Sequence, residues 1–285
     1  MPLDEDKYPE QTGRRRFVKG VVGSATLATV AAGTAGSINT ATSAPGAGGG
    51  PTEFIGIEIM DGPAPRGMPI VPIEITDDGV LQGRWPEVSE QNQGGRTVTV
   101  AREDVGGITY SSTWFQYCGV QQYAGTQPGA DADSQLLLKP ETYEWLKNLE
   151  GGRPLRVDDF SDYETWTNDF GSPGDGKPGM ADWRSSSDGR PLPVQVVRSP
   201  EVPKLANGEG KYSDIPVDVL SFIDAATEES FIAWMDKCSH FCCVPGYRTS
   251  DFEGAGDKVY CQCHQSVYDP FSPTKYQFVA LPRPD

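Results

Sequence analysis

The pattern of apolar and polar positions predicts a mostly β protein. Short apolar or alternating runs of strand length stand at 54–59, 70–75, 96–102 and 108–115. The tripeptide Asp-Asp-Gly at 77–79 marks a turn between strands. Regular structure resumes over 216–235, and its last apolar run leads directly into Cys238. We therefore expect antiparallel β-sheets joined by many turns.

One helix is predicted, over residues 140–149. Pro140 stands at its start, Glu141 lies in its first turn, and two glycines follow its end at 151–152. Proline early, acid in the first turn and glycine after the last turn are the usual helix boundaries.

The middle of the chain is rich in turn residues. Over 171–179, glycine and proline recur too often for a regular element. We therefore expect a long loop-rich insertion around 80–215. Three of its tryptophans are interpreted as core or lid aromatics, namely Trp145, Trp166 and Trp183.

The N-terminal segment resembles an export signal. Residues 14–19 (Arg-Arg-Arg-Phe-Val-Lys) fit the twin-arginine pattern, and 20–38 contain no charge. An ordinary basic N-terminus before a buried helix is the alternative. Because about 20 apolar residues span a bilayer and the positive residues come first, we expect 1–39 to be a signal that is kept as a membrane anchor, with the globular head on the extracytoplasmic face. Cleavage at the small residues 41–44 is the alternative. A flexible Gly/Pro tether over 40–52 then leads to a globular domain over 53–285.

Composition narrows the possible partners. The formal net charge is −16, so nucleic acid, which requires a basic surface, is not an expected partner. The charge fits either simple solubility or a high-salt environment. Glycine (33) and proline (24) make up 57 of 285 residues, or 20%, against an average of about 12%, which favours short strands and turns.

The chemistry is concentrated in the 32 residues 238–269, which contain five of the six cysteines and both histidines. They form two pairs of soft ligands, Cys238-x-His240 and Cys261-x-x-His264. Two thiolates on one iron and two imidazoles on the other would hold a [2Fe–2S] cluster. A structural zinc site also uses two Cys and two His, although its usual knuckle is C-x₂₋₄-C rather than C-x-H.

Residues 238–245 and 261–269 resemble the two boxes of the Rieske iron–sulfur proteins, C-T-H-x-G-C-x-P and C-P-C-H-G-S-x-Y-D, of the disulfide-bearing kind in cytochrome bc complexes. The resemblance implies four metal ligands, Cys238, His240, Cys261 and His264. It also implies a disulfide between Cys243 and Cys263, and hydroxyls at Ser266 and Tyr268 that bond to cluster or ligand sulfur.

The resemblance further implies a fold and a function. The fold is Rieske-type antiparallel β-sheets with a small cluster-binding part over 236–285. The function is electron transfer, in which a quinol gives an electron to the cluster and a cytochrome or small blue-copper protein accepts it. The chain would be a redox subunit of a membrane respiratory complex, beside a cytochrome b-type subunit, and His264 would be the imidazole that faces the quinol.

The ligand set itself predicts a high reduction potential coupled to protons. Replacing two thiolates by neutral imidazoles makes the site less negative, which raises the potential into the range of about −150 to +300 mV. Hydroxyl donors at Ser266 and Tyr268 favour its upper part. A ferric ion acidifies the outer nitrogen of a bound imidazole, so reduction raises that pKa and electron uptake brings proton uptake.

The chain departs from the family pattern at several positions. Cys242, Gln262 and Gln265 replace the usual glycine, proline and glycine. Because Cys118 is otherwise alone and the expected compartment is oxidising, a second disulfide between Cys118 and Cys242 is a hypothesis. The family also has a proline loop over the cluster, for which residues 281–284 are the candidate.

Three other functions share part of these features. The small subunit of an arsenite-oxidase-like enzyme has the same signal and site but a molybdenum-containing partner. Rieske ferredoxins and oxygenases lack the loop-joining cysteines, so Cys243 and Cys263 disfavour them. A non-catalytic exported metal-binding protein is the alternative outside redox chemistry.

Overall fold

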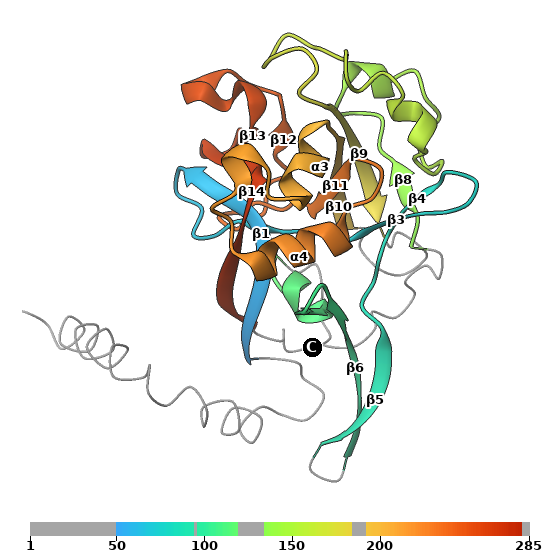
Figure 1. Ribbon diagram of the computed structural model, residues 1–285, viewed down its shortest axis with the longest axis vertical. Coiled ribbons are helices and arrows are strands. Elements are labelled where there is room, and N and C mark those ends of the chain that lie inside the picture. The colour runs from blue at the N-terminus through green and yellow to red at the C-terminus, as the bar shows by residue number, and fades with distance from the viewer. Residues whose placement is uncertain (1–49, 94–95, 119–133, 184–191, 281–285) are drawn as a thin grey trace, which may run out of the picture. The chain divides into compact units, whose positions relative to one another are not determined.

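The computed structural model describes residues 50–93, 96–118, 134–183 and 192–280 (Figure 1). These residues belong to one compact unit, Pro45–Asp285. The expected signal at 14–19, the apolar segment 20–38, the tether up to residue 49 and the proline segment 281–284 lie outside the described residues. The first strand begins at Gly50, three residues before the expected start of the globular domain.

Strands dominate the fold, and every ladder between them is antiparallel, as expected. The strands are β1 (Gly50–Asp61), β2 (Met68–Pro69), β3 (Ile73–Ile75), β4 (Leu81–Gly83), β5 (Val88–Gln93), β6 (Arg96–Val105), β7 (Ile108–Ser111), β8 (Leu136–Leu138), β9 (Lys177–Trp183), β10 (Leu192–Arg198), β11 (Phe231–Met235), β12 (Gly246–Tyr247), β13 (Val259–Cys261) and β14 (Ser266–Ala280).

The helices of the described residues are short. Two of them are α-helices, α3 (Glu201–Ala206) and α4 (Val217–Ala226), and the others are 3₁₀ turns: η3 (Ser112–Phe115), η4 (Glu144–Leu146), η5 (Val157–Phe160), η6 (Gly210–Tyr212) and η7 (Phe252–Asp257). Helix α4 buries Val219, Phe222 and Ile223 at helical spacing, and Phe222 contacts Trp114 with ring centroids 5.5 Å apart. In the described part of the chain, no helix has the length and apolar character needed to cross a membrane.

The strands that precede and follow the ligand residues lie in two sheets. A five-stranded sheet has the order β12-β13-β14-β1-β2, and a four-stranded sheet has the order β11-β10-β9-β8. Two smaller sheets pair β3 with β4 and β5 with β6 and β7. Strand β13 ends at Cys261 and β11 ends three residues before Cys238, so each candidate ligand cysteine lies at or just after the end of a strand.

The long ladder between β1 and β14 joins the two ends of the described chain (Figure 1). Its register runs from Gly50 opposite Ala280 to Asp61 opposite Val267. Phe54, Ile55 and Ile57 of β1 are completely buried in the common hydrophobic core. Strand β1 thus pairs along the strand that leaves the second ligand loop.

The predicted helix over 140–149 is wrong, because only the 3₁₀ turn η4 forms there. Tyr143, just before η4, has an extended backbone. Its buried hydroxyl oxygen lies 2.8 Å from Gln195 Oε1 and 2.9 Å from the Tyr247 carbonyl oxygen, two acceptors that share its single proton. These distant contacts fix a backbone conformation that local helix signals do not predict.

The expectation of a loop-rich middle is wrong for residues 177–183 and 192–198, which form the buried strands β9 and β10. Glycine and proline are used there for packing. A Cβ at Gly179 would lie 2.8 Å from the Phe160 ring, and Pro178 uses its carbonyl to accept a hydrogen bond from the Trp145 indole at 2.9 Å. Trp183 is a core residue as expected, while Trp145 and Trp166 are half-buried.

Two predicted strands are shorter than expected. Over 70–75 only β3 is a strand, and Ile70 instead forms an isolated bridge with Trp234 of β11. Over 108–115 the strand β7 ends at Ser111, whose hydroxyl accepts the backbone N–H of Thr113 and starts the 3₁₀ turn η3.

Candidate metal centre

Two tight loops present the ligand residues. The first ligand loop, 238–245, follows β11, and backbone bonds from Cys238 N to Cys243 O (2.8 Å) and from Cys242 N to Cys238 O (2.9 Å) close it. The second ligand loop, 261–266, connects β13 to β14 and is closed by a bond from Gln265 N to Cys261 O (2.8 Å). Both loops are therefore held by their own backbone.

Cys238 and Cys261 are the two free cysteines, and both are buried. Their side chains are hydrogen-bonded to each other. Two backbone N–H groups also donate to each sulfur, those of His240 and Phe241 to Cys238 and those of Cys263 and His264 to Cys261. This pattern of donors stabilises negative charge on sulfur, which is the form that binds metals.

The thiol pair favours one thiolate. The hydrogen bond from Cys261, with further donors from Tyr268 and the backbone, outweighs burial and lowers the pKa of Cys238 to about 5. The pKa of Cys261 is raised, because its proton is held in that hydrogen bond and because the thiol is buried. At neutral pH the metal-free pair therefore holds one proton between two sulfurs.

The two hydroxyls at the site have different partners. The Tyr268 hydroxyl, buried among core residues, donates to Cys238 Sγ at 3.1 Å, and burial raises the pKa of Tyr268. Ser266 is also buried, but its Oγ accepts the backbone N–H of Ala64 at 3.2 Å. Tyr268 thus makes the sulfur contact expected of it, whereas the observed partner of Ser266 is a third segment.

The two imidazoles lie together. The rings of His240 and His264 have centroids 4.7 Å apart, and the exposed ring of Phe241 contacts both, at 4.4 Å and 5.0 Å. His264 is exposed and His240 is half-buried. Nδ1 of His240 is buried without a hydrogen-bond partner among the described residues. Leaving such an atom unpaired costs about 1–3 kcal/mol, so it is a ready ligand atom.

The disulfide implied by the resemblance and the hypothesised second disulfide are both present. Cys243 is bonded to Cys263 with Cα atoms 6.6 Å apart, and Cys118 is bonded to Cys242 with Cα atoms 5.5 Å apart. Because Cys242 and Cys243 are adjacent, the first ligand loop is linked covalently both to the second loop and to the segment after η3.

Three cysteine sulfurs lie close together, but only one of them belongs to a free thiol. In the described residues, the sulfurs of Cys243, Cys261 and Cys263 lie within 4.8 Å of one another. Two of them are joined in the disulfide, and a disulfide sulfur is no thiolate. Cys261 is therefore the metal ligand that this group offers.

Two residues of the loops have a left-handed backbone. Cys242 and Gln265 have φ values of 64° and 63°. This left-handed conformation costs a residue with a Cβ about 1–2 kcal/mol. Each loop therefore contains one residue that lowers its stability.

A third segment, missed from the sequence, covers the two ligand loops. We name residues 62–67 (Gly-Pro-Ala-Pro-Arg-Gly) the capping loop; it connects β1 to β2. Ala64 bonds to Ser266 of the second loop, while Ser239 Oγ of the first loop donates to the Arg66 carbonyl at 2.6 Å. The frequent glycine and proline residues of this segment indicate a turn, but they do not predict which residues the turn contacts.

The base of the first ligand loop is polar and buried. The Trp234 indole donates to Asp236 Oδ1 at 3.3 Å, and burial raises the pKa of Asp236 well above its usual value. The Tyr117 hydroxyl donates to the Lys237 carbonyl at 2.9 Å, which joins the segment before Cys118 to the same strand end.

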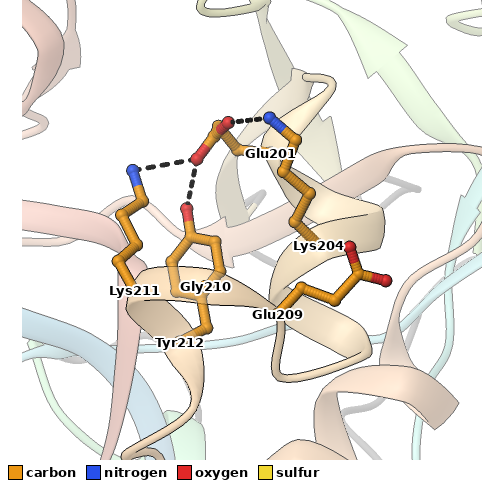
Figure 2. Close-up of a pocket in the computed structure, with 6 residues that line it drawn as sticks. All are labelled: Glu201, Lys204, Glu209, Gly210, Lys211 and Tyr212. Carbon is orange, nitrogen blue, oxygen red and sulfur yellow. Dashed lines mark hydrogen bonds and ion pairs between the residues drawn. The ribbon is translucent and has the colours of Figure 1, made fainter.

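Two cavities lie outside the ligand pairs. One of about 440 Å³ adjoins the ligand loops at Val244, Pro245 and Gln262. The other, of about 450 Å³, lies beside α3, where the Glu201 carboxylate accepts bonds from two lysines and the Tyr212 hydroxyl (Figure 2). Two lysines and two glutamates, Glu201 and Glu209, line the second cavity, so its side-chain charges sum to zero.

In comparisons with known proteins, the chain matches no family model, no curated protein and no solved structure.

Proposed function

We propose that this protein transfers electrons through a Rieske-type [2Fe–2S] cluster. Cys238 and Cys261 would hold one iron, and His240 and His264 the other. When bound, such a cluster supplies reversible one-electron transfer at about −150 to +300 mV. The observation that carries the proposal is the separation of ligand types, with two hydrogen-bonded thiols in the core and two touching imidazoles toward the surface.

Two further features support a metal at this position. The unpartnered Nδ1 of His240 lacks the hydrogen bond that a buried nitrogen requires. Each thiol sulfur also accepts two backbone N–H groups, so the site stabilises negative charge before a metal binds. The donors are fixed by the loops and would not need to reorganise on loading.

The exposed side of the site suits a quinol donor. The Phe241 ring, 66% exposed, and the imidazole of His264 offer an apolar contact beside a proton acceptor. The ring nitrogen of His264 that is not a metal ligand would accept the proton of the quinol hydroxyl. Tyr268 would stabilise the electron-rich sulfur of Cys238 through its hydrogen bond. A cytochrome or small blue-copper protein would then take the electron.

The location belongs to the same proposal. We infer that 1–39 anchor the head at the extracytoplasmic face of the cell membrane, next to a cytochrome b-type subunit. The two disulfides support a non-cytoplasmic site, because disulfides persist in oxidising compartments. Co-purification with a cytochrome b tests the complex, whereas a molybdopterin protein as partner would favour the arsenite-oxidase-like alternative.

The decisive experiment is spectroscopy of the reduced, purified protein. We expect an electron paramagnetic resonance signal of a two-iron cluster with mixed ligands, and a potential that falls with pH above the pKa of an imidazole. Absence of that signal, together with one zinc per chain in metal analysis, would refute the redox proposal. It would instead favour an exported metal-binding protein without redox activity.

A further inference from the structure

We propose that Arg66 of the capping loop raises the reduction potential of the metal centre by acting as an unpaired positive charge. This inference rests on the proposed function, since it concerns the same site. Neither ligand box contains Arg66; it reaches the site only through the fold.

The position of Arg66 is fixed by contacts with the site. Its carbonyl accepts the hydroxyl of Ser239, the residue between the ligands Cys238 and His240. Its guanidinium lies over the ring of Phe278 (4.3 Å to the centroid) and that of Tyr117 (4.8 Å). Such cation–π contacts hold the group in place without neutralising its charge.

No carboxylate in the described part of the chain pairs with the Arg66 guanidinium. Among the residues that the structure describes, it makes no ion pair, and its Nε is buried without a hydrogen-bond partner. In a protein with 40 acidic and 24 basic residues, a half-buried arginine without an acid is unusual. Burial lowers the pKa of Arg66, and the nearby Tyr117 and Tyr268 partly offset this effect.

An unpaired cation stabilises an added electron. Reduction adds one negative charge to the centre, and the quinol or a chemical reductant supplies that electron. By Coulomb's law at an effective dielectric constant of about 20, a positive charge about 10 Å from a redox centre would make the reduced form roughly tenfold more favourable. Arg66 would in this way stabilise the reduced centre electrostatically, without contacting the electron donor.

The test is a redox titration of the loaded protein. We expect Arg66→Gln to lower the midpoint potential by about 59 mV, the equivalent of a tenfold change for one electron. Arg66→Lys should keep most of the wild-type potential because it keeps the charge. Arg156→Gln, which removes the same charge at an exposed position paired with Asp78, should leave the potential unchanged.

The results of these titrations distinguish failure of the inference about Arg66 from failure of the proposed function. A wild-type protein without a two-iron signal refutes the function. A normal signal with an unchanged potential in Arg66→Gln refutes only the role of Arg66. If Arg66→Gln incorporates the cluster poorly, Arg66→Met is titrated in its place, because it removes the charge and retains the apolar stem over the two rings. If neither Arg66→Gln nor Arg66→Met retained the cluster, Arg66 would have a structural role, and the inference would also be overturned.

Discussion

The hydrogen bond from Tyr268 to Cys238 makes the sharpest prediction. Tyr268→Phe removes only the hydroxyl that donates to Cys238 Sγ at 3.1 Å, and it leaves the buried ring in place. A hydrogen bond to a charged group contributes about 1.5–3 kcal/mol, and one pKa unit corresponds to about 1.36 kcal/mol. In the metal-free protein the pKa of Cys238, about 5, should therefore rise by about 1–2 units.

The same substitution should affect the loaded protein more weakly. The hydroxyl bonds to sulfur in both redox states, so only the difference between the two bonds alters the potential. We expect the midpoint potential to fall by about 30–60 mV, at most one factor of ten for a single electron. The electron paramagnetic resonance signal should persist, since all four ligands remain.

Two assays measure these effects. Thiolate absorbance in the ultraviolet, followed as a function of pH in chelator-treated protein with its disulfides intact, reports the pKa of Cys238. Redox titration reports the potential. Tyr110→Phe is the matched control, because it also removes a buried hydroxyl, one that donates to the Arg84 carbonyl at 2.8 Å and not to sulfur. The reasoning fails if Tyr268→Phe leaves both quantities unchanged, or if Tyr110→Phe shifts them equally.

Three predictions concern stability. Gln265→Gly should raise the free energy of unfolding by about 0.5–1 kcal/mol in urea titrations, because relief of the left-handed backbone outweighs the entropy of glycine; a decrease would contradict this account. The double variant Cys118→Ser/Cys242→Ser should lose about 3–5 kcal/mol while peptide mapping still finds the other disulfide, and an unchanged stability would rule out a structural bond here. For Glu201, burial raises the pKa, but bonds from two lysines and a tyrosine outweigh it and hold the pKa at about 2, below the ordinary 4.5. The contribution of the Glu201 carboxylate to the free energy of unfolding is thus complete above pH 4.5 and is lost as the pH falls through 2. Because solvent screens these ion pairs, Glu201→Gln should reduce the change in the free energy of unfolding between pH 4.5 and 2 by only about 1 kcal/mol. Parallel pH profiles of the variant and the wild type would count against this.

The candidate ligands could be found from the sequence because their signal is local. The spacings Cys238-x-His240 and Cys261-x-x-His264 bring each pair together within a single turn, whatever the rest of the chain does. The pairing of Cys118 with Cys242, 124 residues apart, followed instead from counting cysteines in an oxidising compartment. No spacing rule gives that contact.

Other features depend on contacts that no local pattern encodes. The helix signals at 140–149 are overruled by the bonds of Tyr143 to Gln195 and Tyr247, which lie in other elements. The capping loop reads only as a turn, although it bonds to both ligand loops. Gly179 looks like a strand breaker until Phe160 is seen to fill the space of its missing side chain.

The ladder between β1 and β14 also determines how far the site lies from the start of the described chain. Strand β14 leaves the second ligand loop at Ser266 and runs 15 residues to Ala280, which pairs with Gly50. At about 3.3 Å per residue, the strand spans up to roughly 45 Å. The imidazoles and Gly50 thus lie at opposite ends of one hydrogen-bonded ribbon. In the proposed function, an electron donor or acceptor would therefore contact the imidazoles at the end of the ribbon far from Gly50.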